Sequence, residues 1–271
     1  MSISMRSLTF TAVDELGFAA AAGNLDPRQP PARYEPKRLG PLLELRNLVA
    51  TGRAPGSAVS DWLVPNGAAP MLNALAEDRE RWISSDHKRM GYIRAMRGRP
   101  DGDSHLTAFL MDAQRAAREV AGLPGNTSGQ LAAAMKELEN NIHEHSDAPA
   151  TGILAFRAGR GTFEFVVADR GIGILASLRH NRKFRALADH GKALESALSD
   201  GTSRFGSNSG RGYGFRPIFI GLVNLHGSLR FRSGDHALLM DGTSPKLTTA
   251  QLAQKPTIDG FFASICCKTK P

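Results

Sequence analysis

The sequence lacks any long hydrophobic run and has almost no cysteine. No apolar segment of the 271 residues approaches the roughly 20 residues that span a bilayer, so no membrane anchor is expected. Residues 18–22 are apolar, but Asp14 and Glu15 precede them, which disfavours a secretory signal. The two cysteines, Cys266 and Cys267, are adjacent, and neighbouring cysteines form only strained bridges. These absences predict a cytoplasmic protein whose thiols are reduced.

Several signatures of nucleotide and metal binding are also missing. No Gly-x-x-x-x-Gly-Lys-Ser/Thr loop occurs, which excludes a P-loop NTPase. A Rossmann fingerprint is excluded because Phe215 occupies the position of its third glycine. His143 and His145 are two residues apart, which on a helix points their side chains about 200° apart. This spacing is not the zinc pattern His-Glu-x-x-His, so no zinc site is expected.

Basic residues outnumber acidic ones by 34 to 26, which gives a formal net charge of +8. Such a balance favours an anionic partner, whether a nucleotide, a nucleic acid or an acidic protein face. Arginines and lysines are frequent over residues 79–99, but Glu77, Asp78, Glu80 and Asp86 are mixed among them. An ordinary charged helix face explains that mixture at least as well as a nucleic-acid site. Binding to nucleic acid therefore rests on the net charge alone.

Hydrophobic periodicity predicts the elements of the first 125 residues. A short strand is expected over residues 5–12 and a proline-rich connection over 27–41. Helices are expected over residues 41–50, 70–83 and 104–121.

The pattern is clearer from residue 126 onward. A helix there places Leu131, Met135, Leu138 and Ile142 on one inward face. Strands are expected over 153–157 and 163–168. A lid-like stretch over 174–209 follows, with few apolar anchors apart from a helix over 187–198 that carries Leu194 and Leu198. A helix over 215–225 and strands over 229–232, 237–240 and 261–267 complete the order. This order predicts an α/β fold, a two-layer sandwich with a mixed, largely antiparallel sheet covered by helices. Two domains are expected, a mainly helical region over 1–125 and the sandwich over 126–271.

The first polar motif lies on the predicted helix, where residues 137–145 read ELENNIHEH. Glu137 and Asn141 are four residues apart, so on a helix they share one face about one turn apart. An amide oxygen can join phosphates and waters around Mg²⁺, and a carboxylate can act as a general base. An exposed polar face on a buried helix has the same pattern, so this motif alone does not decide the function.

The second motif, Asp-Arg-Gly-Ile-Gly over residues 169–173, follows the apolar strand 163–168. Asp169 at the end of that strand can accept a hydrogen bond from an adenine amino group. Gly171 and Gly173 would let the backbone pass close beneath the base. The alternative is a strand-ending Asp-x-Gly turn, which is frequent in α/β proteins.

The third motif, Gly-Arg-Gly-Tyr-Gly over residues 210–214, ends a stretch rich in serine and glycine and leads into an apolar helix. Glycine-rich backbone at a helix N-terminus offers N–H groups and the positive end of the helix dipole to phosphates. The arginine would add a charge-assisted contact. The residues of this stretch expected to contact ATP are Thr202, Ser203, Ser209, Gly210, Arg211, Gly212, Tyr213 and Gly214.

In this order the three motifs resemble the N box, G1 box and G2 box of the GHKL ATPases, the family of gyrase, Hsp90, histidine kinases and MutL. The resemblance covers roughly residues 126–271 and implies a GHKL-type sandwich with a Mg²⁺-ATP site. It implies that Glu137 is the catalytic base and Asn141 the Mg²⁺ ligand. It also implies that His145 faces the phosphates and that Asp169 binds adenine.

Two departures from the family narrow the expected function. Gyrase, Hsp90 and MutL relatives continue into a second domain that supplies a catalytic lysine, whereas this sequence ends soon after its last predicted strand. A histidine kinase has an upstream phospho-acceptor histidine, but His87 and His105 lack the expected Glu and Pro neighbours. ATP hydrolysis is therefore expected, or phosphoryl transfer to a regulatory protein partner as in anti-sigma-factor kinases. The alternatives are an ATP-dependent conformational switch with little turnover and a nucleic-acid-associated ATPase.

Overall fold

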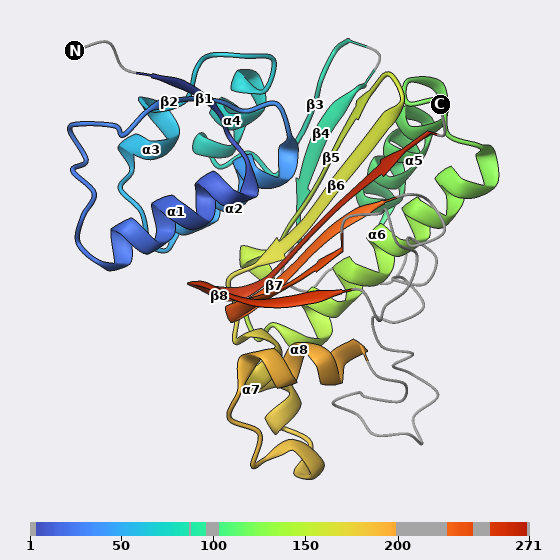
Figure 1. Cartoon of the computed structure of the whole chain (residues 1–271). Helices are drawn as coiled ribbons and strands as arrows, with labels where there is room; N and C mark the ends of the chain where they lie inside the picture. Colours follow the sequence, from blue (N-terminus) through green and yellow to red (C-terminus); the bar gives the residue numbers. More distant parts are fainter. Residues whose placement is uncertain (1–3, 87, 96–102, 199–226, 241–249, 270–271) are drawn as a thin grey trace.

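The computed structural model describes residues 4–86, 88–95, 103–198, 227–240 and 250–269. In these ranges a six-stranded sheet with the order β3-β4-β5-β6-β8-β7 lies between helices (Figure 1). Every described pairing in this sheet is antiparallel, so the sheet is not mixed as predicted. No helix in the described ranges combines the length and the apolar character that crossing a membrane requires. The chain is a mixed α/β protein, as its sequence predicts.

The strands of the sheet are short at one edge and long at the other. Their bounds are β3 Arg81–Ile83, β4 Met90–Arg94, β5 Ile153–Gly159, β6 Thr162–Asp169, β7 Ser228–Met240 and β8 Gln251–Lys268. β6 contains aromatic and β-branched side chains, which favour strands, and most of it is buried. A tight turn joins it to β5, and Gly161 in that turn has a φ of 71°, which glycine adopts without strain. The strands predicted over 153–157 and 163–168 are confirmed.

The two strands predicted over 229–232 and 237–240 form one continuous strand, β7. Its pairing with β8 shifts register between Ser233 and His236, and Gly234 within the shift has a φ of 60°. A β-bulge of this kind absorbs an irregular residue without ending the strand. The strand predicted over 261–267 is confirmed as the C-terminal part of the longer β8.

One face of the sheet is covered by α5 (Ser104–Glu119) and α6 (Gly125–His145), and both predicted helices are confirmed (Figure 1). Asp103 caps α5, because its carboxylate accepts hydrogen bonds from N–H groups of the first turn. The ring centroids of Phe109 and Phe156 are 5.3 Å apart, which joins α5 to β5. The α6 residues predicted to point inward are all buried: Leu131, Met135, Leu138 and Ile142.

The same apolar core extends to α7 (Gly173–Arg179), a 3₁₀ helix (Arg182–Phe184) and α8 (His190–Leu198). The sequence predicts few apolar anchors in this part of the lid apart from the helix near Leu194 and Leu198. The buried residues of α8 agree with that prediction, and those of α7 contradict it. The anchors are Ile174, Leu175, Leu178, Ala193, Leu194 and Ala197, which are all buried. Residues 174–198 are therefore part of the packed body, while the rest of the predicted lid lies outside the described residues.

The other face of the sheet carries a second hydrophobic core, built by the N-terminal elements. These elements are the parallel pair β1 (Met5–Ser7) and β2 (Arg33–Glu35), and the helices α1 (Phe10–Ala21), α2 (Leu39–Ala50), α3 (Ser57–Ser60) and α4 (Ala69–Ala76). Trp62 is buried at 1% exposure, and Val166 and Phe262 contribute from the sheet. In the described residues, helices therefore cover both faces of the sheet. The two-layer sandwich was predicted for residues 126–271, and the N-terminal elements add a third layer to it.

Three predictions for the N-terminal region have different outcomes. The helix over 41–50 is confirmed by α2. The strand over 5–12 is wrong beyond β1, because Thr9 accepts a hydrogen bond from the Ala12 N–H at 3.1 Å and caps α1. The helix over 70–83 is wrong beyond α4, since Asp78 follows it with a φ of 58° and β3 begins soon after.

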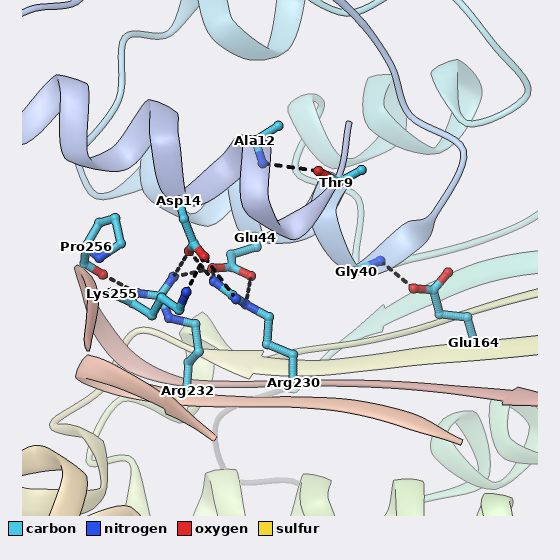
Figure 2. A network of polar contacts seen from close by, with 10 residues as sticks. All are labelled: Thr9, Ala12, Asp14, Gly40, Glu44, Glu164, Arg230, Arg232, Lys255 and Pro256. Atoms are coloured by element: carbon cyan, nitrogen blue, oxygen red, sulfur yellow. Dashed lines mark hydrogen bonds and ion pairs between the residues drawn. The ribbon is translucent and has the colours of Figure 1, made fainter. Parts of the chain in front are cut away.

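A buried ionic network holds α1 and α2 on the sheet (Figure 2). Arg230 and Arg232 of β7 are 2% and 0% exposed, and both contact the carboxylate of Glu44 on α2. Asp14 of α1 pairs with Arg230 and lies 2.9 Å from the Lys255 ammonium nitrogen. Buried charges are costly unless they are paired, so these partners require the two layers to stay together.

Glu164 of β6 fixes the beginning of α2 on the same face. Its carboxylate oxygens accept hydrogen bonds from the backbone N–H groups of Leu39 at 2.7 Å and Gly40 at 2.9 Å. A Cβ atom at Gly40 would lie 2.6 Å from the ring of Phe10, so only glycine fits there. The sheet thus supplies the N-terminal cap of a helix more than a hundred residues earlier in the chain.

The predicted domain boundary at residue 125 does not coincide with a break in the sheet. β3 and β4 precede it, whereas β5 to β8 follow it. β4 pairs with β5 along its whole length, from Met90 opposite Arg157 to Arg94 opposite Ile153. The division into two domains stays a prediction, but the two parts share one sheet.

Candidate functional site

Two of the three motifs lie within the described residues. The motif over 137–145 forms the C-terminal half of α6, and the motif over 169–173 joins β6 to α7. The residues of the third stretch lie outside the described part: Thr202, Ser203, Ser209, Gly210, Arg211, Gly212, Tyr213 and Gly214. The helix predicted over 215–225 and His87 also lie outside it. The candidate site is therefore built from α6, β6 and the elements that touch them.

Asp169 is the last residue of β6 and is only 4% exposed. Its carboxylate accepts a hydrogen bond from the Gly171 N–H at 2.8 Å and another from the Phe261 N–H of the neighbouring strand. Burial raises the pKa of this carboxyl to about 7, and the two backbone hydrogen bonds offset only part of that effect. A buried carboxyl at a strand end can accept a hydrogen bond from a ligand amino group.

Three glycines let the backbone pack closely around Asp169. A Cβ atom at Gly171 would overlap the backbone carbonyl group of Ser146, and one at Gly260 would overlap Asp169 itself. Gly173 has a φ of 73°, and a Cβ atom there would lie 2.7 Å from the Ser233 hydroxyl oxygen. Gly171 and Gly173 thus occupy positions that only glycine fits, because Ser146, Ser233 and Gly260 of the protein itself lie against them. Their contact with an adenine base stays a prediction.

Ser146, the residue that follows the first motif, contacts the second motif. The Ile172 N–H donates to the carbonyl oxygen of Ser146 at 2.9 Å, and Ser146 directly follows α6. On the other side, the Ser233 hydroxyl accepts from the Ile174 N–H at 2.9 Å and donates to the Gly260 carbonyl at 2.8 Å. The loop after β6 is therefore fixed to α6, β7 and β8 at once.

The remaining predicted site residues lie along α6. The helix is continuous through the motif, so Glu137 and Asn141 are one turn apart on it, as predicted. Glu137 is exposed, whereas Asn141 and His145 are half-buried. Their side chains can serve a ligand at the surface of the helix without disturbing its apolar face.

Sequence reasoning missed Glu139, a buried carboxylate in the middle of the first motif. It is 2% exposed and lies 3.0 Å from the Nε2 atom of His143, one turn along α6. The spacing of four between a glutamate and a histidine is the signal that predicts this pair. Ser146, Ser233 and Gly260 were missed as well, and no local pattern marks the last two.

The described residues do not form a metal centre of their own. Within them, no group of three or more His, Cys, Asp or Glu side chains is placed to hold a metal ion. Asn141 as a Mg²⁺ ligand stays a prediction, and its single amide oxygen would act together with the phosphates of a nucleotide.

Five cationic side chains follow the second motif in the chain. Those at Arg179, Arg182, Lys183, Arg185 and Lys192 are all exposed on α7, α8 and the segment between them. This placement agrees with a solvated helix face as well as with contact to an anionic ligand.

Comparison with known proteins adds no relative: no family model, no curated protein and no solved structure matches the chain.

Proposed function

We propose that this protein binds Mg²⁺-ATP in the manner of the GHKL ATPases and hydrolyses it or transfers its terminal phosphate to a partner protein. The observation that carries the proposal is the environment of Asp169. A buried carboxyl stands at the end of a central strand, glycine backbone packs around it, and the loop beside it is bonded to the end of α6.

Each residue has a distinct role in this proposal. Asp169 accepts a hydrogen bond from the adenine amino group, and the backbone at Gly171 and Gly173 lies against the base. Asn141 contributes an oxygen to Mg²⁺, and Glu137 orients and deprotonates the attacking water or hydroxyl group. His145 faces the phosphates, together with the third motif.

The exposure of Glu137 supports its role as a base. Its carboxylate is accessible to a water or hydroxyl group from which it would take a proton. Glu139 is unsuited to this role, since it is buried and already engaged by His143.

The experiment that tests the proposal measures binding and turnover together. Calorimetric titration with ATP, with and without Mg²⁺, gives the affinity, while labelled ATP reports both phosphate release and labelling of a partner. Glu137→Ala should keep ATP bound and slow turnover by about 10²–10⁴-fold, the usual contribution of a general base. Asn141→Ala should instead remove the Mg²⁺ dependence of binding.

Glu119 offers a matched control, since it is an exposed carboxylate on the neighbouring helix α5. Glu119→Ala should leave both readouts unchanged. If the wild-type protein binds ATP without turnover, the result supports an ATP-dependent conformational switch and not an ATPase or kinase. If it binds no ATP, both functions are wrong.

A further inference from the structure

A small pocket lies on the face of the sheet that α2 covers, beside the end of β6. Its polar lining consists of Arg46 and Asn47 from α2, Arg94 from β4, and Thr151, Asp169 and Arg170. Its free volume is about 30 Å³. Since one water needs about 10–15 Å³ of such volume, the pocket has room for a single small polar group and not for a nucleotide.

Three guanidinium groups line this pocket, and carboxylates balance them only in part. Arg94 pairs with Asp78 at 2.6 Å, but the Asp78 side chain is 85% exposed. Arg46 and Arg94 each donate to the carbonyl oxygen of Leu75 at 3.3 Å, and Arg170 donates to a backbone carbonyl of α2 at 3.4 Å. Within the described residues, no carboxylate ion pair is formed by Arg46 or Arg170.

The electrostatics of Arg46 reflect this crowding of like charges. Burial lowers its pKa first, and the neighbouring charges of Arg94 and Arg170 lower it further. Tyr92 and Asp78 oppose these effects only in part. Because an arginine stays protonated in proteins, a bound anion would be the direct way to relieve the repulsion.

Two neutral groups, Asn47 and Thr151, and the buried carboxyl of Asp169 complete the polar lining. The Nδ2 atom of Asn47 is buried and has no hydrogen-bond partner within the described part of the chain, which leaves a donor to be satisfied. Thr151 holds the other side, since its hydroxyl accepts from the Arg170 N–H at 2.9 Å and donates to the Ala148 carbonyl at 2.7 Å. The backbone that carries Arg170 is thus fixed at the edge of the pocket.

We infer that this pocket is an oxyanion site that takes a phosphate group, with Arg46, Arg94, Arg170 and the amide of Asn47 as donors. Guanidinium groups match the geometry of phosphate oxygens and bind them with charge-assisted hydrogen bonds. The site lies on the α2 face and does not involve the residues of α6, but it borders the proposed ATP site, because Asp169 lines both. It holds whether or not the protein binds ATP.

The test uses inorganic phosphate, titrated by calorimetry and thermal unfolding at an ionic strength kept constant with sodium chloride. Saturable binding is expected in the wild-type protein. Arg46→Gln and Arg170→Gln should each weaken it by about 10- to 100-fold, the effect of losing a hydrogen bond to a charged group. Arg118→Gln, which removes an exposed charge from α5, should leave phosphate affinity unchanged.

The unfolding temperature measured without phosphate tells whether Arg46 and Arg170 bind an anion or serve only to hold the backbone. If Arg46 and Arg170 served only to bond backbone carbonyls, both glutamine variants would unfold at lower temperature without phosphate. The oxyanion site predicts unchanged or raised unfolding temperatures, since a like-charge repulsion is removed. Arg170, the more peripheral of the two, provides this readout even if the Arg46 variant does not fold.

A parallel titration with glycerol 3-phosphate distinguishes a phosphomonoester ligand from free inorganic phosphate. Tighter binding than inorganic phosphate supports a phosphomonoester ligand, and equal or weaker binding supports the free anion. The inference is overturned if phosphate does not saturate, if chloride at equal ionic strength stabilises the protein as much, or if Arg118→Gln loses as much affinity as the pocket variants.

Discussion

The face of the sheet under α5 and α6 and the face under α1 and α2 each carry helices and a buried apolar core, but their polar contacts differ. On the first face, long rows of leucine, methionine and phenylalanine pack on β5 and β6. On the second, an apolar core is accompanied by a buried ionic network, a carboxylate that caps a helix and a pocket lined with arginine. Only the first kind of contact follows directly from the hydrophobic pattern of a sequence.

The largest effect is expected from breaking the ionic network. Glu44→Ala leaves the buried charges of Arg230 and Arg232 without their main partner, which should cost about 3–5 kcal/mol of unfolding free energy. Chemical denaturation measures this loss. Glu35→Gln breaks an exposed ion pair with Lys37 and should cost at most about 1 kcal/mol. Equal effects in the two variants would mean that the network does not hold the N-terminal layer.

On the apolar face the corresponding change is Leu138→Ala in the middle of α6. Leu138 is 1% exposed, and removal of such a side chain leaves a cavity that costs about 2–5 kcal/mol. The loss should be the same at pH 5 and pH 8, because no ionisable group is involved. A loss that changes with pH would show that this face depends on charge as well.

A smaller effect, and one that depends on pH, is expected at Asp169, which lies between the two faces. Its pKa is about 7 in the folded protein and near 3.8 when exposed, so the folded state binds the proton more tightly. Its contribution to stability is therefore full below about pH 4 and is lost as the pH rises through 7. Between pH 5.5 and 7 the loss should be about 2 kcal/mol.

Asp169→Asn should remove that slope, since the amide does not titrate. Denaturation midpoints of both proteins at several pH values give the difference directly, and the other ionisable groups cancel in the comparison. Parallel pH curves for the two proteins would place the pKa of Asp169 outside this window.

The sequence predicts the first face better than the second because α6 and the β5–β6 hairpin depend on local patterns. The spacing of Leu131, Met135, Leu138 and Ile142 is helical, and alternation with a glycine turn marks the hairpin. Glu44, the carboxylate partner of Arg230 and Arg232, and the α2 N–H groups that Glu164 caps are more than a hundred residues away from them in the chain. No local pattern identifies such pairs, and the three-layer arrangement was missed for that reason.

The candidate site was also predicted only in part, because some of its residues belong to a local motif and others do not. The positions of Asp169, Gly171 and Gly173 at the end of a strand follow from the local motif, while their contact with a nucleotide stays a prediction. Ser146, Ser233 and Gly260, which hold the loop, belong to distant segments. The helix predicted over 70–83 extends too far, because the backbone conformation of Asp78 does not continue a helix. The hydrophobic pattern does not encode that conformation.

The central claim is that Asp169 recognises adenine, and ATP titration of the wild-type protein and Asp169→Asn at pH 8 tests it most directly. Above its pKa the carboxylate is ionised and accepts a strong hydrogen bond from the amino group, whereas the amide accepts a weaker one. We predict that the variant keeps its fold and loses about 1.5–3 kcal/mol of binding free energy, a loss of about 10- to 100-fold in affinity. GTP, which lacks the amino group at that position, should bind weakly to both proteins. Equal ATP affinity in the two proteins, or no binding by the wild type, would contradict the account.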